Sequence, residues 1–482
     1  MGIMKFFKIL ILFFLFSFLS YSQENTKDID KRYITEIIKH KVKRKQTLYT
    51  ISKLYNVSID DIKKYNTQIQ GLNISRKMEL NIPIKRKLVL KNDIFQINKD
   101  SIKSEIKEGK DFKINLLDSR LKNKNIKLGL LAPFNLNNIE IDSVENSKNY
   151  LKNLNLSTIS LDFYSGLLTA LEKGQELGLN LDLKVIDTQN DFLNIGKIIS
   201  TNSFENYDFI IGPLIPRNIN QFSIGIIKSN TPVISPLTSK EIEINNNVFQ
   251  SMPSEESQRD KMFKYIEQII ETDPDPCVMI IYDDKSQKIK EKLLKSYPYA
   301  ELINTDLTNG LVDPELTDSL FVNNKNNIVF LESQNLNVIT SVSSLLNSQI
   351  SQERNIAMMT TYRADVYENE NISYEHLGNL KFTYPSYHRP IYDEKLDVFN
   401  ELYLNNYGKL PNKIAIRGYD LTLDLILRVA YKNKLIKSLD IGETDYMQNK
   451  FNYLSKNNGY INNSVFLIQH DKLNIFEIYN DK

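Results

Sequence analysis

Short apolar runs alternate with amphipathic helical stretches from Ile126 to the C-terminus, and this alternation restricts the fold more than any other feature. Strands followed by helices at this spacing predict a parallel sheet with crossover helices. The stretch is long for a single core, so we expect two lobes. The predicted strands are Ile126–Leu131, Leu181–Ile186, Phe209–Ile211, Pro232–Ser235, Val278–Tyr282, Ile328–Leu331 and Ile356–Met359. The predicted helices are Ser160–Leu177, Ser257–Ile270, Leu336–Leu346, Asp393–Tyr407 and Asp420–Tyr431.

Charge divides the chain into a basic and an acidic part. Residues 23–125 hold 25 Lys and Arg against 13 Asp and Glu, whereas residues 126–482 hold 34 against 46. The larger part would repel phosphates, which argues against a nucleic-acid-binding protein. The single cysteine excludes an intramolecular disulfide and a cysteine-based zinc site.

Residues 1–22 are typical of a signal peptide. Lys5 and Lys8 precede an apolar run, and Ser20 and Ser22 stand where a signal peptidase prefers small residues. The alternative is an uncleaved anchor, but the run is shorter than the ~20 residues that a spanning helix needs. We therefore expect cleavage near Ser22, export to the periplasm, and no stable membrane span afterwards.

A compact basic segment, residues 39–84, follows the signal peptide. Thr47 can cap a helix that carries Leu48 and Ile51 on one face, Ser58 can cap a second helix, and Met78, Leu80 and Ile82 alternate as a returning strand. Residues 85–125 read as a basic linker, with a pair of added strands around residues 88–90 and 95–97 as the alternative.

The segment of residues 39–84 resembles a LysM domain, the module that binds peptidoglycan and chitin. The residues that carry the resemblance are His40, Val42, Thr47-Leu48, Ile51-Ser52, Tyr55, Val57-Ser58, Ile62, Asn66, Gly71-Leu72, Met78, Leu80 and Ile82-Pro83. It implies a β-α-α-β module that binds glycan between two loops. The first loop contains Lys45, Gln46, Thr47 and Leu48. The second contains Asn66, Thr67, Gln68 and Ile69. Lys45-Gln46 replaces the usual Gly-Asp.

The larger part resembles type I periplasmic binding proteins, notably receptors for branched-chain amino acids. The resemblance rests on Leu128-Gly-Leu-Leu-Ala-Pro, Val185-Ile-Asp-Thr, Ile210-Ile-Gly-Pro-Leu, Pro232-Val-Ile-Ser-Pro, Val248-Phe-Gln-Ser-Met-Pro-Ser and the stretch from Val398 to Asp420. It implies two α/β lobes that close on a ligand. We expect lobe 1 to comprise residues 126–252 and 388–445, and lobe 2 to comprise residues 253–387 and 446–482.

Polar side chains after the predicted strands are the candidates for a ligand site, because open α/β sheets bind ligands at the carboxyl ends of their strands. Pro216 stands near a position where the receptors have a ligand-binding residue, and proline has no N–H to donate. Glu332 is the candidate to hold an ammonium group. The candidates are Leu214, Ser235, Leu237, Thr238 and Ser239 in lobe 1, and Tyr282, Asp283, Glu332, Thr360, Tyr362 and Tyr384 in lobe 2.

Motifs of catalysis are absent from the sequence. It has no dinucleotide fingerprint, no P-loop and no G-x-S-x-G elbow. No pair of carboxylates stands out as that of a glycosidase. We therefore expect neither enzymatic activity nor a cofactor or metal.

Two functions remain open for this non-enzymatic cell-envelope protein. In the first, it binds peptidoglycan through the LysM module and a small amino-acid-like or peptide-like ligand between the lobes. In the second, the lobes form a protein-interaction scaffold that regulates peptidoglycan synthesis or envelope assembly, and an envelope protein is the partner.

Overall fold

The computed structural model describes residues 33–42, 46–55, 57–69, 71, 73–87, 115–119, 121, 125–139, 143–240, 242–305, 310–389, 394–456 and 458–478. Contacts divide the chain into two compact units, Met1–Gly109 and Lys110–Lys482. The predicted signal peptide lies outside the described residues.

The smaller unit is the predicted β-α-α-β module. Strands β1 (Tyr33–Lys41) and β2 (Glu79–Lys87) pair antiparallel, and helices α2 (Leu48–Tyr55) and α3 (Ile59–Lys64) connect them. Thr47 accepts a hydrogen bond from the backbone N–H of Thr50, and Ser58 accepts one from that of Asp61, so both predicted caps are present. The core contains Val42, Leu48, Ile51, Ile62, Leu80 and Ile82.

Lobe 1 of the larger unit is a seven-stranded sheet in the order β15-β16-β7-β6-β5-β3-β4. All neighbouring pairs are parallel except β15 and β16. Side chains alternate between its faces, so Phe209 packs on one core and Ile210 on the other. The strands are β3 (Asn125–Ala132), β4 (Asn180–Asp187), β5 (Phe209–Ile211), β6 (Val233–Ser235), β7 (Val248–Gln250), β15 (Tyr453–Lys456) and β16 (Gly459–Asn462).

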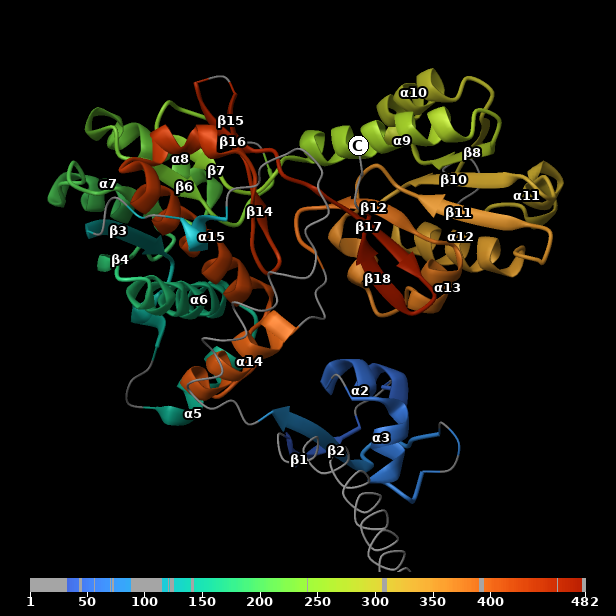
Figure 1. The fold of residues 1–482 in the computed structure, drawn as a ribbon, viewed down its shortest axis with the longest axis horizontal. Coiled ribbons are helices and arrows are strands. Elements are labelled where there is room, and N and C mark those ends of the chain that lie inside the picture. The colour runs from blue at the N-terminus through green and yellow to red at the C-terminus, as the bar shows by residue number, and fades with distance from the viewer. Residues whose placement is uncertain are drawn as a thin grey trace, which may run out of the picture. The chain divides into compact units, whose positions relative to one another are not determined.

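Helices cover both faces of this sheet (Figure 1). Residues of α6 and α15 share one core with the sheet, and residues of α7 and α8 share the other. The helices of lobe 1 are α5 (Val144–Lys152), α6 (Leu156–Glu176), α7 (Phe192–Thr201), α8 (Pro216–Gly225), α14 (Glu394–Tyr407) and α15 (Lys413–Lys432), with the short helices η1 (Leu116–Asp118), η2 (Leu136–Asn138), η3 (Ile227–Ser229) and η6 (Leu435–Ile441).

Lobe 2 repeats this plan, with a second seven-stranded sheet in the order β18-β17-β12-β11-β10-β8-β9. Along β8, Met279 and Ile281 face one core, whereas Ile280 and Tyr282 face the other. The strands are β8 (Cys277–Tyr282), β9 (Glu301–Asn304), β10 (Asn326–Glu332), β11 (Asn355–Met359), β12 (Thr383–Ser386), β17 (Phe466–Asp471) and β18 (Asn474–Glu477). The helices are α9 (Glu255–Thr272), α10 (Gln287–Ser296), α11 (Pro314–Leu320), α12 (Leu336–Ser348) and α13 (Tyr374–Asn379), with η4 (Asp284–Ser286) and η5 (Asp365–Glu368).

The described chain passes between the lobes after β7, after β12 and after β16. Because β16 pairs with β7, residues 453–462 belong to lobe 1, whereas residues 446–482 were expected in lobe 2. The expected linker also ends earlier than residue 125. Leu116 is buried in the lobe 1 core, so this part of the stretch belongs to the folded unit.

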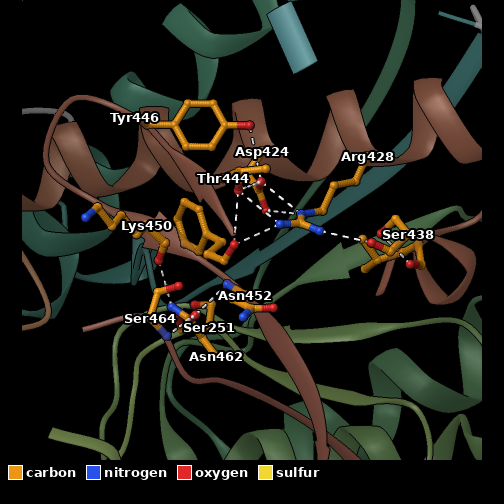
Figure 2. Close-up of polar contacts among 12 residues, drawn as sticks. Ser251, Asp424, Arg428, Ser438, Thr444, Tyr446, Lys450, Asn452, Asn462 and Ser464 are labelled. Carbon is orange, nitrogen blue, oxygen red and sulfur yellow. Dashed lines mark hydrogen bonds and ion pairs between the residues drawn. The ribbon is translucent and has the colours of Figure 1, made fainter. Parts of the chain in front are cut away.

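Helix α15 carries a buried ion pair that fixes the chain after it. Asp424 and Arg428 are both fully buried, and their side chains lie 2.9 Å apart. Arg428 also donates to the carbonyl oxygens of Ser438 in η6 and Phe451 (Figure 2). Phe451 lies in β14 (Lys450–Phe451), which pairs with β13 (Thr444–Asp445). The pair therefore ties η6 and this hairpin to the lobe 1 core.

Glycines let α6 and α15 approach until their backbones touch. A Cβ on Gly166 would lie 1.8 Å from the carbonyl oxygen of Ala415, and one on Gly418 would lie 2.2 Å from that of Phe163. Any larger residue would force the helices apart.

Gly166→Ala should therefore lower the free energy of unfolding by roughly 1–3 kcal/mol, because the helices must shift to admit the methyl group. Gly196→Ala is the matched control: its Cβ would meet only the Gln221 side chain, at 3.8 Å. The control should gain up to about 1 kcal/mol from its better helix propensity. Urea unfolding followed by far-UV circular dichroism measures both, since the chain has no tryptophan. Equal stability of Gly166→Ala and the wild type would contradict the close contact.

The buried ring of His470 should make stability depend on pH. Burial lowers the pKa of His470 to about 4, and the Arg363 cation adds to the effect. The unfolded chain takes up this proton near pH 6.5, so stability should fall by up to roughly 3 kcal/mol as the pH drops from about 6.5 to 4. His470→Phe should reduce this slope in urea titrations at several pH values, with the remainder due to His388, whose pKa burial also lowers to about 4. His376→Gln should keep the full slope. An unchanged slope in His470→Phe would refute the assignment.

Candidate functional site

The first predicted glycan loop is held by local hydrogen bonds. Gln46 lies 2.9 Å from the ring Nε2 of His40, and Thr47 is exposed at the start of α2. Leu48 is 1% exposed and belongs to the core. Contrary to the prediction, it offers a glycan almost no surface. Lys45 lies outside the described residues.

The second predicted loop contains a structural residue. Asn66 is 1% exposed, and its amide donates to the carbonyl oxygens of Ile62 and Asn81 and accepts from the N–H of Asn81. It therefore joins α3 to β2 rather than offering a contact to glycan, which corrects the prediction. Thr67 and Gln68 are exposed beside it, and Ile69 packs partly on the core.

In lobe 1, the predicted cleft residues follow β5 and β6. Leu214 is buried in the core, and Leu237 packs against it. Thr238 is buried and accepts from the N–H of Lys240, while Ser239 is half-buried. The hydroxyl of Ser235 is buried and has no hydrogen-bond partner among the described residues. These side chains do lie at the carboxyl edge of the sheet, and Ser235 has unused hydrogen-bonding capacity there.

In lobe 2, the predicted residues lie at the ends of β8, β10, β11 and β12. Tyr282 packs in the core, and Asp283 accepts from the Ser286 hydroxyl at 2.9 Å. Tyr384 is buried in the core, with its hydroxyl 3.4 Å from His470 Nε2. Thr360 is buried and donates to the carbonyl oxygen of Tyr362. Tyr282 and Tyr384 therefore act mainly as core residues.

Glu332 is paired inside its own lobe. Its carboxylate lies 3.1 Å from the Nη1 atom of Arg259 and accepts from the N–H and hydroxyl of Thr361 at 2.6 and 2.9 Å. The Arg259 Nη1 atom also bonds the Thr361 hydroxyl. Burial raises the pKa of Glu332, although the Arg259 cation and the bonds from Thr361 oppose this effect. The Arg259 guanidinium thus occupies the place beside Glu332 where the ammonium group of a ligand was predicted to bind.

Two contacts join the lobes near these strand ends. The hydroxyl of Tyr362 interacts with Ser239 across the lobe boundary. Lys413, the first residue of α15, pairs with Glu368 of η5. The structure therefore brings the predicted residues Ser239 and Tyr362 together, while Leu214 and Tyr384 lie in separate cores.

Two arginines of this region were not among the predicted site residues. Arg259 lies one turn into α9, and its guanidinium also stacks 5.4 Å from the ring centre of Tyr362. Arg417 of α15 is buried and donates to the carbonyl oxygen of Pro236, the Ser251 hydroxyl and Asn449. Both residues sit in amphipathic helices, where a cation usually marks the solvent side, so the sequence carried no signal for them.

The described residues hold no group of three or more His, Cys, Asp or Glu side chains suited to a metal ion. No helix among them is both long and apolar enough to cross a bilayer.

Two parts of the chain are similar to known proteins. Residues 40–83 match the LysM domain family. A sequence search of curated proteins gave no match. Among solved structures, a putative branched-chain amino acid ABC transporter from Rhodospirillum rubrum is 11% identical with a TM-score of 0.47, and covers 73% of this chain and 100% of its own.

Two further structures give similar values. An ABC-type branched-chain amino acid transporter from Rhodopseudomonas palustris is 11% identical with a TM-score of 0.46, covering 74% of this chain and 98% of its own. An ABC transporter substrate-binding protein from Desulfitobacterium hafniense in complex with Leu is 14% identical with a TM-score of 0.41, covering 73% and 100%. The chain thus has a LysM domain at residues 40–83, followed by two mostly parallel sheets with flanking helices.

Proposed function

We propose that this protein is a non-enzymatic component of the cell envelope that binds peptidoglycan through its LysM domain and contacts another envelope protein through its two lobes. The match of residues 40–83 to LysM supports the first part, and the sequence of residues 1–22 supports export. The ion pair between Arg259 and Glu332 carries the second part.

That pair argues against the recognition of a free amino acid. An ammonium group could reach the Glu332 carboxylate only by displacing the Arg259 contact and the bonds from Thr361 that already occupy it, although Arg259 would keep its pair with Glu255. The strand ends of lobe 2 are therefore already satisfied by the protein's own charges, as expected for a scaffold.

A small amino-acid-like or peptide-like ligand is the second candidate, and the buried hydroxyl of Ser235 favours it. A buried polar group without a partner is unfavourable by about 1–3 kcal/mol. Thr238 and Ser239 lie a few residues further along the same loop. A ligand that accepted or donated a hydrogen bond at Ser235 would remove that penalty.

Peptidoglycan binding should depend on the exposed loop after α3. Thr67→Ala with Gln68→Ala, in the chain from residue 23 onward, should weaken sedimentation with purified peptidoglycan by roughly tenfold in affinity, because two hydrogen bonds are lost. Asp60→Asn, exposed at the start of α3, is the control and should bind like the wild type. A wild-type chain that stays soluble with wall material would refute wall binding.

Thermal melting should separate the two candidates for the lobes. As a scaffold, the wild type should melt at the same temperature with amino acids or muropeptides as without them, and cross-linked envelopes should yield one stoichiometric partner. That partner should still co-purify with the Thr67→Ala, Gln68→Ala chain. A ligand at a hundred times its Kd would instead stabilise the fold by about 2.7 kcal/mol. A shift of this size, lost in Ser235→Ala, would favour the receptor.

A further inference from the structure

Charged side chains gather where the chain passes between the lobes. Lys450 and Asp445 come from the β13–β14 hairpin of lobe 1, Arg389 from the passage after β12, and Glu477 from β18 of lobe 2. Glu443, just before β13, lies 3.9 Å from Lys450 and belongs to the same cluster. Lys261 of α9 is near it, because the charges of Glu443 and Glu477 act to raise the pKa of Lys261. We call the first four residues together with Phe466 the hinge clasp.

Two cations of the clasp lie against one aromatic ring. The Arg389 guanidinium is 4.8 Å and the Lys450 ammonium 4.5 Å from the ring centre of Phe466, which is 1% exposed at the start of β17. The face of an aromatic ring attracts a cation, and this attraction strengthens where water is excluded. Phe466 is the first residue of β17, where the chain reaches lobe 2 after β16. Its ring therefore links this passage to the β13–β14 hairpin and to the passage after β12.

The anions connect the cations of one lobe to the other lobe. Lys450 lies 2.6 Å from Glu477, and their side chains are 6% and 8% exposed. Arg389 bonds Asp445 of lobe 1 and lies 3.6 Å from Glu477 of lobe 2. Ser464, in the passage after β16, donates to Glu443 at 2.9 Å. Arg389 and Ser464, which lie in two of the passages between the lobes, are therefore each bound to charged side chains of the lobes.

Burial makes these contacts more effective than ordinary surface pairs. Exposed ion pairs contribute about 0–1 kcal/mol and are screened by salt, whereas removing one partner of a buried pair leaves an uncompensated charge. Lys456 and Glu256 form an exposed pair between β15 of lobe 1 and α9 of lobe 2, with side chains 46% and 68% exposed. The molecule thus offers a buried and an exposed link between the same lobes.

We propose that the hinge clasp is an ionic lock that fixes the angle between the two lobes without any ligand. Lobe movement then requires Lys450 and Glu477 to separate and Arg389 to exchange partners. The lock consists of the protein's own side chains, so it operates whether or not a small molecule binds between the lobes.

Distances between the lobes test the lock. In a Cys277→Ser background, spin labels at Lys197→Cys on α7 and Lys288→Cys on α10 report the interlobe distance by pulsed electron paramagnetic resonance; both positions are exposed. The otherwise wild-type chain should give one narrow distance peak. Glu477→Gln and Lys450→Met should each raise the fraction of molecules outside this peak by roughly tenfold, because the 2.6 Å pair is lost and the remaining charge keeps only more distant partners.

Lys456→Met is the matched control, since it removes the exposed pair and should keep the narrow peak. Lys450→Glu combined with Glu477→Lys should restore the narrow peak, because the two positions again carry opposite charges, with the signs exchanged. Circular dichroism identifies any variant that fails to fold, and Asp445→Asn then replaces it. If folded Glu477→Gln and Lys450→Met retain the wild-type distance distribution, the lock does not exist. A broad distribution in the control would also overturn the proposal.

Discussion

The buried ion pair between Asp424 and Arg428 is the interaction on which the lobe junction depends. Arg428 donates to carbonyl oxygens of η6 and β14, and together with the Thr444 hydroxyl, which also donates to Phe451, it fixes the path of the chain after α15. That path delivers Asp445 and Lys450 to the hinge. The same helix touches α6 at Gly166 and presents Arg417 to the loop after β6. One helix therefore organises the core of lobe 1 and the residues that meet lobe 2.

The strand ends and the hinge share one physical principle, which is that the protein compensates its own buried charges. Glu332 is matched by Arg259, and Lys450 is matched by Glu477. A binding protein that must respond to a charged ligand benefits from leaving such a charge for the ligand to neutralise. The buried pair of Lys450 and Glu477 instead favours a defined relation between the lobes, which suits a surface presented to a protein partner. The Ser235 hydroxyl is one of several buried polar atoms among the described residues that have no hydrogen-bond partner.

Most of the architecture was predictable because the apolar pattern is local. Strands such as Phe209–Ile211 were predicted at their observed bounds, and the two-lobed class followed from their alternation with helices. The start of α15 was placed seven residues too late, at Asp420 instead of Lys413. Its buried Arg417, Asp420 and Asp424 resemble a solvent face in sequence, so the apolar stripe seemed to begin later. The site was predictable only as a set of strand ends, and the structural role of Asn66 was not, because its distant partner Asn81 lies on β2.

The sequence by itself determined the LysM module, the basic and acidic parts, and two lobes built of strands and crossover helices, since these follow from residue type and spacing along the chain. Only the tertiary structure decided which charges meet. Arg259 and Glu332 are 73 residues apart, and Lys450 and Glu477 are 27 apart. Whether a carboxylate is open to a ligand or neutralised by the protein depends on which helix the fold packs against its strand, and no local pattern encodes that choice.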